Sequence, residues 1–544
     1  MAVENLITEH IDIWTSAVKA KSTSGRGSSK KLELYGVKKL RELILELAVR
    51  GKLVPQDPND EPASVLLERI AAEKAKLVKA KKIKKQKSLG QVSKDEELFD
   101  TPTGWAWTRI SEIAEISPRN STTDDDAEVS FVPMPLITTN YDGSHGSEKR
   151  IWKEIKKGYT HFQDGDIALA KITPCFENSK AAVFSGLEGG VGAGTTELHV
   201  ARPLSDCINP LFVLLYLKAP IFLKVGETKM TGSAGQKRVP KDFFSENPLP
   251  FPPSNEQHRI VAKVDELMAL CDQLEQQTEA SIEAHQMLVT TLLDTLTNSA
   301  DADELMQNWA RISEHFDTLF TTEESIDQLK QTILQLAVMG KLVHFGADPM
   351  ETSVKDVISF GPRNGLSPKE VQGDTGIKVL KLGATSYGSL NLDESKSVDV
   401  DIEKTSHLWL KKGDILIQRG NSANYVGCNC LVKEDVCDVI YPDLMMKIRP
   451  SKTVSSEFLS TWLSSPMARE FMWTRMTGTS GTMPKISKKV VEAIPIIVPS
   501  KKIQDMVVSK VEELFSICEL LKQLISETQQ TQSQLTDTIV EQAI

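Results

Sequence analysis

The chain has 544 residues, of which 40% are hydrophobic and 25% charged, proportions typical of a soluble globular protein. At about 100–200 residues per domain, this length predicts roughly three to five structural units. The net charge of −10 and the pI of about 5.6 exclude a protein coated in positive charge, so any nucleic-acid binder of this composition must concentrate its basic groups locally.

No apolar run reaches the length of about 18 residues that a membrane span needs, and the first residues lack the basic-then-apolar pattern of a secretion signal. The seven cysteines are irregularly spaced, which argues against a disulfide framework. A cytoplasmic protein with reduced thiols is expected.

Residues 1–101 are predicted to form an N-terminal helical end-piece. The Lys/Ser/Gly-rich stretch around 19–31 is interpreted as a flexible insertion. Residues 73–87 hold eight lysines and one glutamate, and we expect a segment that is helical at its start and solvated throughout. Contact with DNA phosphates is the alternative role of this lysine-rich segment.

Two globular units, 102–254 and 346–500, combine strand-like and helix-like segments bounded by Gly, Pro, Asn and Asp. The predicted strands are 131–132, 166–170, 197–201, 377–382, 414–417 and 444–448, and the predicted helices are 211–217 and 456–463. Each unit is therefore expected to be mixed α and β.

A helix over 255–297 opens the region 255–345, and a second helix over 502–542 fills most of 501–544. Apolar residues in the first follow a 4-3-4-3 spacing that is typical of a coiled-coil seam: Ile260, Val264, Leu267, Cys271 and Leu274. After a polar stretch the seam is predicted to resume at Leu288 and Leu292. The second helix repeats the pattern from Val507, with Leu535 and Ile539 near its end.

The chain repeats itself. Residues 40–54 and 329–343 are identical at ten of fifteen positions, at an offset of 289. Five shorter matches keep their order at offsets of 244 to 248, among them Gly165-Asp-Ile with Gly413-Asp-Ile, and Arg202-Pro with Arg449-Pro. The two offsets indicate a circular order of end-piece, globular unit and long helix, in which the last helix is completed by the N-terminal end-piece.

These features predict an α+β protein with two mixed α/β domains related by pseudo-twofold symmetry and separated by an antiparallel coiled coil of two long helices. The duplicated Leu-Ala-Val-x-Gly-Lys-Leu-Val motif, residues 54–63, and the Pro-rich 248–260 entry to the helix resemble the specificity subunits of Type I restriction–modification enzymes. The resemblance covers nearly the whole chain.

The resemblance implies that each globular unit is a target recognition domain that reads one half of an asymmetric, bipartite DNA site. It also implies docking of two methyltransferase subunits and, through them, up to two motor–nuclease subunits. The chain itself would be non-catalytic and carry no cofactor, with S-adenosylmethionine, ATP and Mg²⁺ bound by the partners.

Base reading needs side chains with paired donors and acceptors on loops. The candidates lie in two Arg-Asn turns, after each Gly-Asp-Ile motif, and in the glycine-rich loops 230–241 and 476–488. In unit one they are Arg119, Asn120, Lys171, Gln236, Lys237 and Arg238; in unit two they are Arg363, Asn364, Arg419, Asn421, Ser422, Asn424, Thr479, Ser480 and Lys485.

The repeated end-pieces supply candidates for subunit contacts. His10 and His315 occupy equivalent positions, and a buried or subunit-contact role fits them better than catalysis. The other candidates are Leu47, Val49, Leu336 and Val338.

Catalytic and metal motifs fail in detail. The glycines of 189–194 lack the lysine of a phosphate loop, and Asn247-Pro-Leu-Pro does not match the tetrapeptide of amino-methyltransferases. Cys428, Cys430 and Cys437 lack a fourth ligand at zinc-site spacing.

Two other functions stay open from the sequence alone: a nuclease or methyltransferase with an unrecognised site, and a coiled-coil adaptor that never touches DNA. Activity of the isolated chain would favour the first. Sequence preference that is unaffected by changes in both glycine-rich loops would favour the second.

Overall fold

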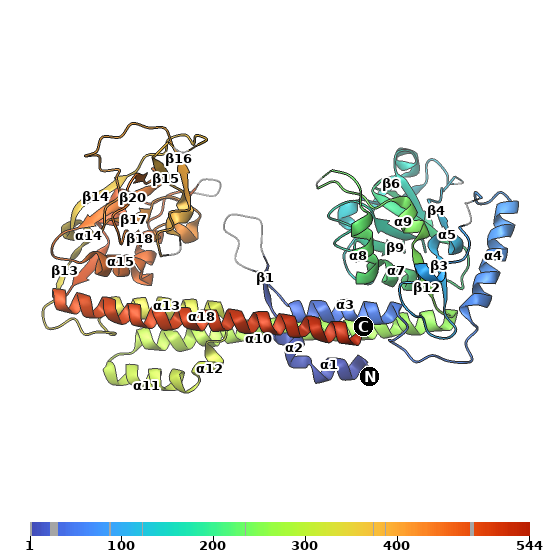
Figure 1. Ribbon diagram of the computed structural model, residues 1–544, viewed down its shortest axis with the longest axis horizontal. Coiled ribbons are helices and arrows are strands. Elements are labelled where there is room, and N and C mark those ends of the chain that lie inside the picture. The colour runs from blue at the N-terminus through green and yellow to red at the C-terminus, as the bar shows by residue number, and fades with distance from the viewer. Residues whose placement is uncertain are drawn as a thin grey trace. The chain divides into compact units, whose positions relative to one another are not determined.

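The computed structural model describes residues 3–21, 31–85, 89–121, 123–233, 235–373, 375–386, 388–478 and 483–544 (Figure 1). The chain forms two compact units. Unit 1 comprises residues 1–19, 33–278 and 531–544, and unit 2 comprises residues 20–32 and 279–530. Each unit therefore contains one globular domain and a part of each long helix. Within the described residues, no helix is both long and apolar enough to cross a membrane.

Domain 1, residues 102–254, is built on two four-stranded sheets, ordered β6-β5-β10-β7 and β4-β11-β8-β9, and a two-stranded pair β12-β3. Its strands are β3 (Ala106–Arg109), β4 (Ala114–Ile116), β5 (Glu128–Val132), β6 (Glu148–Ile151), β7 (Thr160–Gln163), β8 (Ile167–Ala170), β9 (Ala181–Val183), β10 (Val191–Gly194), β11 (Leu198–Pro203) and β12 (Pro248–Phe251). Its helices are α5 (Ile110–Ile113), α6 (Trp152–Ile155), α7 (Pro210–Lys218), α8 (Pro220–Lys229) and α9 (Lys241–Glu246), with short 3-10 turns η2 (Met134–Leu136) and η3 (Glu188–Gly190).

Domain 2, residues 346–500, repeats this plan. Its sheets are ordered β14-β20-β17-β18, β16-β15-β19 and β13-β21. The strands are β13 (Met350–Ser353), β14 (Ile358–Asn364), β15 (Lys378–Leu380), β16 (Ser395–Ser397), β17 (Ile415–Gln418), β18 (Asn429–Leu431), β19 (Val439–Ile440), β20 (Met445–Pro450) and β21 (Pro495–Val498). The helices are α14 (Val354–Val357), α15 (Ser456–Ser464), α16 (Pro466–Trp473) and α17 (Lys488–Glu492), with η4 (Leu382–Thr385) and η5 (Ala423–Tyr425).

The two domains share a topology in detail. In each, one parallel strand pair, β5 with β10 or β15 with β19, lies in the sheet that is otherwise antiparallel. All the strands and helices predicted for the two globular units are present, and the predicted α+β class with two repeated domains and long helices is confirmed.

A buried ion pair explains two of the repeated sequence matches. In domain 1, Asp166 is 0% exposed, and its carboxylate accepts from Arg202 Nε (2.9 Å) and Nη2 (2.8 Å). The same carboxylate accepts from the Gln163 N–H (2.8 Å). The Gly-Asp-Ile and Arg-Pro motifs are therefore the two sides of one contact, which joins the start of β8 to the end of β11.

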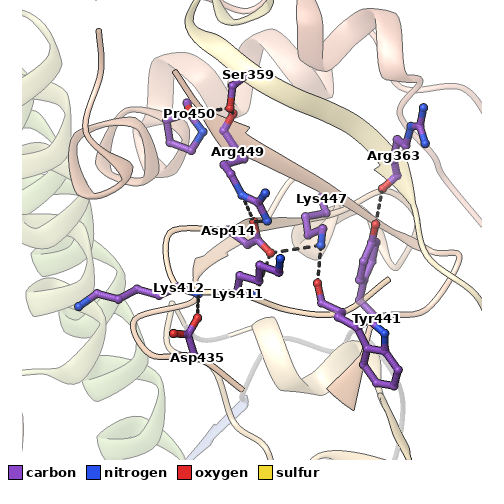
Figure 2. Close-up of polar contacts among 11 residues, drawn as sticks. Ser359, Arg363, Lys411, Lys412, Asp414, Asp435, Tyr441, Lys447, Arg449 and Pro450 are labelled. Carbon is purple, nitrogen blue, oxygen red and sulfur yellow. Dashed lines mark hydrogen bonds and ion pairs between the residues drawn. The ribbon is translucent and has the colours of Figure 1, made fainter. Parts of the chain in front are cut away.

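Domain 2 contains the same contact with one addition (Figure 2). Asp414 is 0% exposed and pairs with Arg449 (2.6 Å), and it also pairs with the buried Lys447 (3.2 Å). The Lys447 ammonium donates to the Trp409 carbonyl (2.7 Å). Burial lowers the pKa of Lys447, and Asp414 opposes that shift.

The helical elements carry the rest of the chain. They are α1 (Val3–Glu9), α2 (Ile11–Ser16), α3 (Tyr35–Val49), α4 (Ala63–Lys79), η1 (Lys94–Glu96), α10 (Ser254–Asn298), α11 (Ala302–Glu314), α12 (Phe316–Leu319), α13 (Glu323–Val338) and α18 (Lys501–Ala543); short strands β1 (Lys19–Lys21) and β2 (Lys31–Glu33) precede α3. Most of the predicted insertion, residues 22–30, and residues 86–88 of the lysine-rich segment lie outside the described residues.

The seam prediction holds for the first part of each long helix and for Ile539, and it is wrong at Leu288 and Leu535. Ile260, Val507 and Ile539 are buried, but Leu288 and Leu535 are about half exposed, at 50% and 45%. In the first helix Val289, next to Leu288, is buried instead. The polar stretch in mid-helix does not fix the phase of the pattern, and a 3.6-residue helix drifts from a 3.5-residue repeat, so the buried face moves by about one residue.

Equivalent helix pairs occur in the two units. Arg41 of α3 contacts Asp272 of α10 in unit 1, and Lys330 of α13 contacts Glu519 of α18 in unit 2. These are the same positions of the repeat, at offsets of 289 and 247. Unit 1 also joins the two chain ends, because the Tyr35 hydroxyl donates to Asp537 of α18 (2.7 Å).

Each end-piece helix also caps a helix of its domain. The buried Glu46 of α3 accepts from the Ile221 N–H at the start of α8 (2.5 Å), and Gln335 of α13 accepts from the Met467 N–H at the start of α16 (3.0 Å). A side-chain acceptor at this place satisfies one of the unpaired N–H groups of a helix N-terminus. The contact therefore fixes each globular domain to its own helical base.

Replacing Asp414 with alanine leaves Lys447 buried without its counter-charge. We expect the free energy of unfolding to fall by about 3–5 kcal/mol, because an uncompensated buried charge is the costly product of breaking such a pair. Thermal and urea-induced unfolding of the full chain measures this. The matched control is Glu513→Ala, whose partner Lys510 lies on an exposed helix face and whose loss should cost less than about 1 kcal/mol. Equal losses for the two variants would contradict the role given to Asp414.

Candidate nucleic-acid interface

The glycine-rich loop of domain 1 lies against the segment that follows β8. The Val239 N–H donates to the Lys171 carbonyl (2.8 Å), and the Thr173 N–H donates to the Lys237 carbonyl (3.0 Å). Two segments about 65 residues apart in sequence are thereby held side by side. This arrangement brings together four of the sequence-predicted residues: Lys171, Gln236, Lys237 and Arg238.

Domain 2 builds the equivalent site in the same way. The Ile486 N–H donates to the Arg419 carbonyl (2.9 Å), and Gly420 and Lys485 form a β-bridge. Arg419 and Lys485 are therefore neighbours, as Lys171 and Arg238 are in domain 1. Thr479 and Ser480 lie outside the described residues.

The loop after β17 is tied to the domain interior. The Asn421 amide donates to Gln418 Oε1 (2.7 Å), and its own oxygen accepts from the Ser422 N–H (2.8 Å). Gln418 is fully buried. Asn421 therefore shapes the loop, whereas Asn424 is exposed and its backbone carbonyl accepts from Arg469.

An arginine–carboxylate pair stands out in the domain 1 site. Arg238 Nε and Nη2 donate to the two oxygens of Glu197, each at 2.9 Å. The Arg238 guanidinium holds the pKa of the Glu197 carboxyl below its usual value, so the carboxylate stays charged at neutral pH. In domain 2 the corresponding positions are Lys485 and Leu444, and the pair is absent from the described residues.

Sequence reasoning singled out Arg238 but missed Glu197. The signal that the sequence offered for Glu197 was its position in the repeat. Glu197 directly precedes β11, and the Arg202-Pro and Arg449-Pro matches align it with Leu444. The backbone agrees, since the Lys171 N–H donates to the Glu197 carbonyl and the Arg419 N–H donates to the Leu444 carbonyl.

The first Arg-Asn turn separates into an exposed and a buried residue. Arg119 is exposed, but Asn120 is buried: its amide donates to the Phe162 carbonyl (2.7 Å) and its oxygen accepts from Arg202 (3.0 Å). Both ends of the Asn120 side chain are therefore engaged in contacts that hold the sheet, which argues against base reading by this residue.

The second Arg-Asn pair lies at the end of strand β14, not in the predicted turn, and it is more open. Arg363 is exposed, and its carbonyl accepts from the Tyr441 hydroxyl (3.3 Å), as Figure 2 shows. Asn364 is half-buried, and its side-chain oxygen has no hydrogen-bond partner among the described residues.

The comparisons with known proteins agree with this architecture. The Type I restriction modification DNA specificity domain matches the chain twice, over residues 102–284 and 348–530. The Type I restriction enzyme EcoEI specificity subunit of Escherichia coli is 47% identical over 595 aligned residues, covering 100% of both chains. The EcoAI specificity subunit of Escherichia coli is 48% identical with the same coverage.

The chain belongs to the specificity subunits of Type I restriction enzymes. Subunits of this family are the DNA-recognition component and are not catalytic. A solved chain from work on complex assembly and conformational transition of the type I R-M system is 18% identical, with a TM-score of 0.51 over 82% of this chain and 98% of that chain. This likeness supports the fold. Domains 1 and 2 are from here called recognition domains 1 and 2.

Three of the side chains predicted to contact other subunits are buried within the chain itself. Leu47, Val49 and Val338 are at most 4% exposed, so a subunit contact through them stays a prediction from the sequence. Leu336 differs, since it lines an apolar pocket of unit 2. His315 is exposed and His10 is half-buried, so both remain candidates.

The turn of recognition domain 1 offers a matched pair of variants. Asn120→Ala should lower the free energy of unfolding by about 1–3 kcal/mol, because it strands buried polar groups. Arg119→Ala should change stability by less than about 0.5 kcal/mol and weaken DNA binding with a shallower salt dependence, because an exposed cation is lost. Thermal unfolding and binding titrations over a range of salt concentrations separate the two. A stable Asn120→Ala variant with altered base preference would contradict the structural role.

Proposed function

We propose that this specificity subunit recognises an asymmetric bipartite DNA target, one half-site per recognition domain, and that it holds two methyltransferase subunits and, through them, up to two motor–nuclease subunits. The observation that carries the proposal is the pair of equivalent sites at Lys171/Arg238 and Arg419/Lys485. They have the same backbone frame and different side chains. Two recognition sites with the same backbone and different side chains fit a DNA target whose two halves differ in sequence.

The proposed DNA contacts are the remaining candidates at these two sites and at the two Arg-Asn positions. They are Arg119, Lys171, Gln236, Lys237 and Arg238 in recognition domain 1, and Arg363, Asn364, Arg419, Asn424, Thr479, Ser480 and Lys485 in recognition domain 2. Clustered cations let a chain with a net charge of −10 approach phosphate locally. The partner subunits would supply the remaining positive charge that is needed to neutralise the DNA phosphates.

The domain exchange is the direct test of one half-site per domain. Residues 102–254 are replaced with the equivalent domain of a specificity subunit that has another target, and the chimera is co-expressed with its own methyltransferase. Sequencing of methylated sites should show a change in one half of the motif only. A change in both halves, or in neither, contradicts the proposal.

The surface of unit 2 offers a place for a partner helix. Ile517, Leu520 and Leu524 of α18 are 49–58% exposed and fall at helical spacing on one face. Beside them an apolar pocket of about 490 Å³ is lined by Met306 and Trp309 of α11, among others. Exposed apolar faces of this kind mark protein–protein contacts, and a helix of the methyltransferase is the proposed occupant.

Docking at this face is tested with Leu520→Asp and Leu524→Asp. Each should reduce the amount of co-purifying methyltransferase at least roughly tenfold, because a desolvated charge in an apolar contact costs several kcal/mol. Thermal stability should be unchanged, since both side chains are exposed. The control is Leu392→Asp, a 44% exposed leucine in the loop of recognition domain 2 between η4 and β16. Full methyltransferase recovery with both α18 variants would exclude this face.

Cofactors belong to the partners in this proposal. S-adenosylmethionine would be bound by the methyltransferase, and ATP and Mg²⁺ by the motor–nuclease. Within the described residues, no group of three His, Cys, Asp or Glu side chains is placed to hold a metal ion.

A further inference from the structure

The backbone of Arg238 is held in place by hydrogen bonds. Its N–H and carbonyl both bond to Thr231 across the base of the glycine-rich loop, at 2.8 and 3.0 Å. The next residue, Val239, donates to Lys171, so the loop base is also anchored to the segment after β8. The Cα of Arg238 therefore has little freedom, although its side chain is 43% exposed.

The carboxylate partner is fixed as well. The Glu197 N–H donates to the Thr195 hydroxyl (3.2 Å), and its carbonyl accepts from the Lys171 N–H (2.9 Å). Glu197 is thus anchored on both sides of its own Cα, directly before β11. A carboxylate held in this way determines where the guanidinium plane of Arg238 lies.

The donors of Arg238 can be counted. A guanidinium has five N–H groups. Nε and one Nη2 hydrogen serve Glu197, and one Nη1 hydrogen serves the Gln236 carbonyl (3.2 Å). One N–H on each terminal nitrogen has no partner among the described residues.

Two neighbouring donors on a planar group match the two acceptors, O6 and N7, that guanine shows in the major groove. Because Glu197 already holds the side chain in one orientation, little side-chain entropy remains to be lost when a base is bound. A phosphate needs no such orientation, since a flexible lysine serves it equally well.

We propose that Arg238 reads a guanine in the half-site bound by recognition domain 1, and that Glu197 is the positioning residue that aims it. This inference rests on the proposed function and adds one base and one pair of residues to it. Recognition domain 2 has Lys485 and Leu444 at these positions. It therefore lacks an arginine that is oriented by a carboxylate, so the equivalent base of the other half-site is read differently.

The test uses the full chain co-expressed with its methyltransferase, with methylated sites mapped by sequencing. Domain exchange first assigns one half of the motif to recognition domain 1. In the Arg238→Gln variant, one G·C pair in that half should become degenerate, with methylation of sites carrying another base there rising about ten- to a hundredfold relative to the original motif. Glu197→Gln should relax the same base pair to a smaller extent, and the other half should be unchanged in both variants.

Arg69→Gln is the matched control, because Arg69 also pairs with a glutamate, Glu61, on an exposed surface outside the recognition domains. Its motif should be that of the unaltered chain. The reciprocal variant, Leu444→Glu with Lys485→Arg, installs the pair in recognition domain 2. It should alter the half-site of that domain alone.

Several outcomes overturn the inference. One is a half-site of recognition domain 1 without any G·C pair. Another is a uniform loss of methylation at all sites in Arg238→Gln, which indicates a phosphate contact. Relaxation of different base pairs by the two variants, or no change in the motif, also contradicts the inference. In each of these the domain exchange still reports on the bipartite reading. A chain whose motif is not bipartite would instead contradict the proposed function itself.

Discussion

The buried carboxylates Asp166 and Asp414 organise the two recognition domains. Each sits at the start of a central strand and binds an arginine at the end of the neighbouring strand, which fixes the register of β8 with β11 and of β17 with β20. The segments that follow β8 and β17 carry Lys171 and Arg419. The frame of each candidate DNA site is therefore set by an interaction whose carboxylate is buried inside the domain.

That division of labour explains how two homologous domains can differ in what they bind. The arginine–aspartate pair, the order of the equivalent strands and the backbone contacts of the glycine-rich loop recur in both, although one sheet has four strands in recognition domain 1 and three in recognition domain 2. The side chains projecting from this frame are not, as Arg238 with Glu197 and Lys485 with Leu444 illustrate. Changes at the exposed positions leave the core intact because the core relies on other residues.

Much of the fold could be predicted from the sequence because the chain contains an internal repeat. The two offsets of the repeat predicted the order of domains and helices, and the Gly-Asp-Ile and Arg-Pro matches turned out to be partners. The strands and helices followed from short apolar runs and their bounding residues. The burial of Asn120 could not be predicted, because an Arg-Asn turn has the same local pattern whether its asparagine faces solvent or the core. The predicted burial of Leu288 and Leu535 was wrong for another reason: the phase of a helical seam across a polar stretch depends on partners that are distant in sequence. The Arg238–Glu197 pair, between residues 41 apart, also needed the fold.

The caps at Glu46 and Gln335 show that the two copies have diverged in how firmly they are held. In unit 1 the acceptor is a carboxylate that also pairs with Arg50 (3.1 Å), whereas in unit 2 it is a neutral amide and the position of Arg50 is taken by Met339. A negative charge at a helix N-terminus stabilises it by about 0.3–1 kcal/mol more than a neutral group does. The duplicated contact has therefore kept its place in both copies while its chemistry, and with it the strength of the helix cap, has diverged.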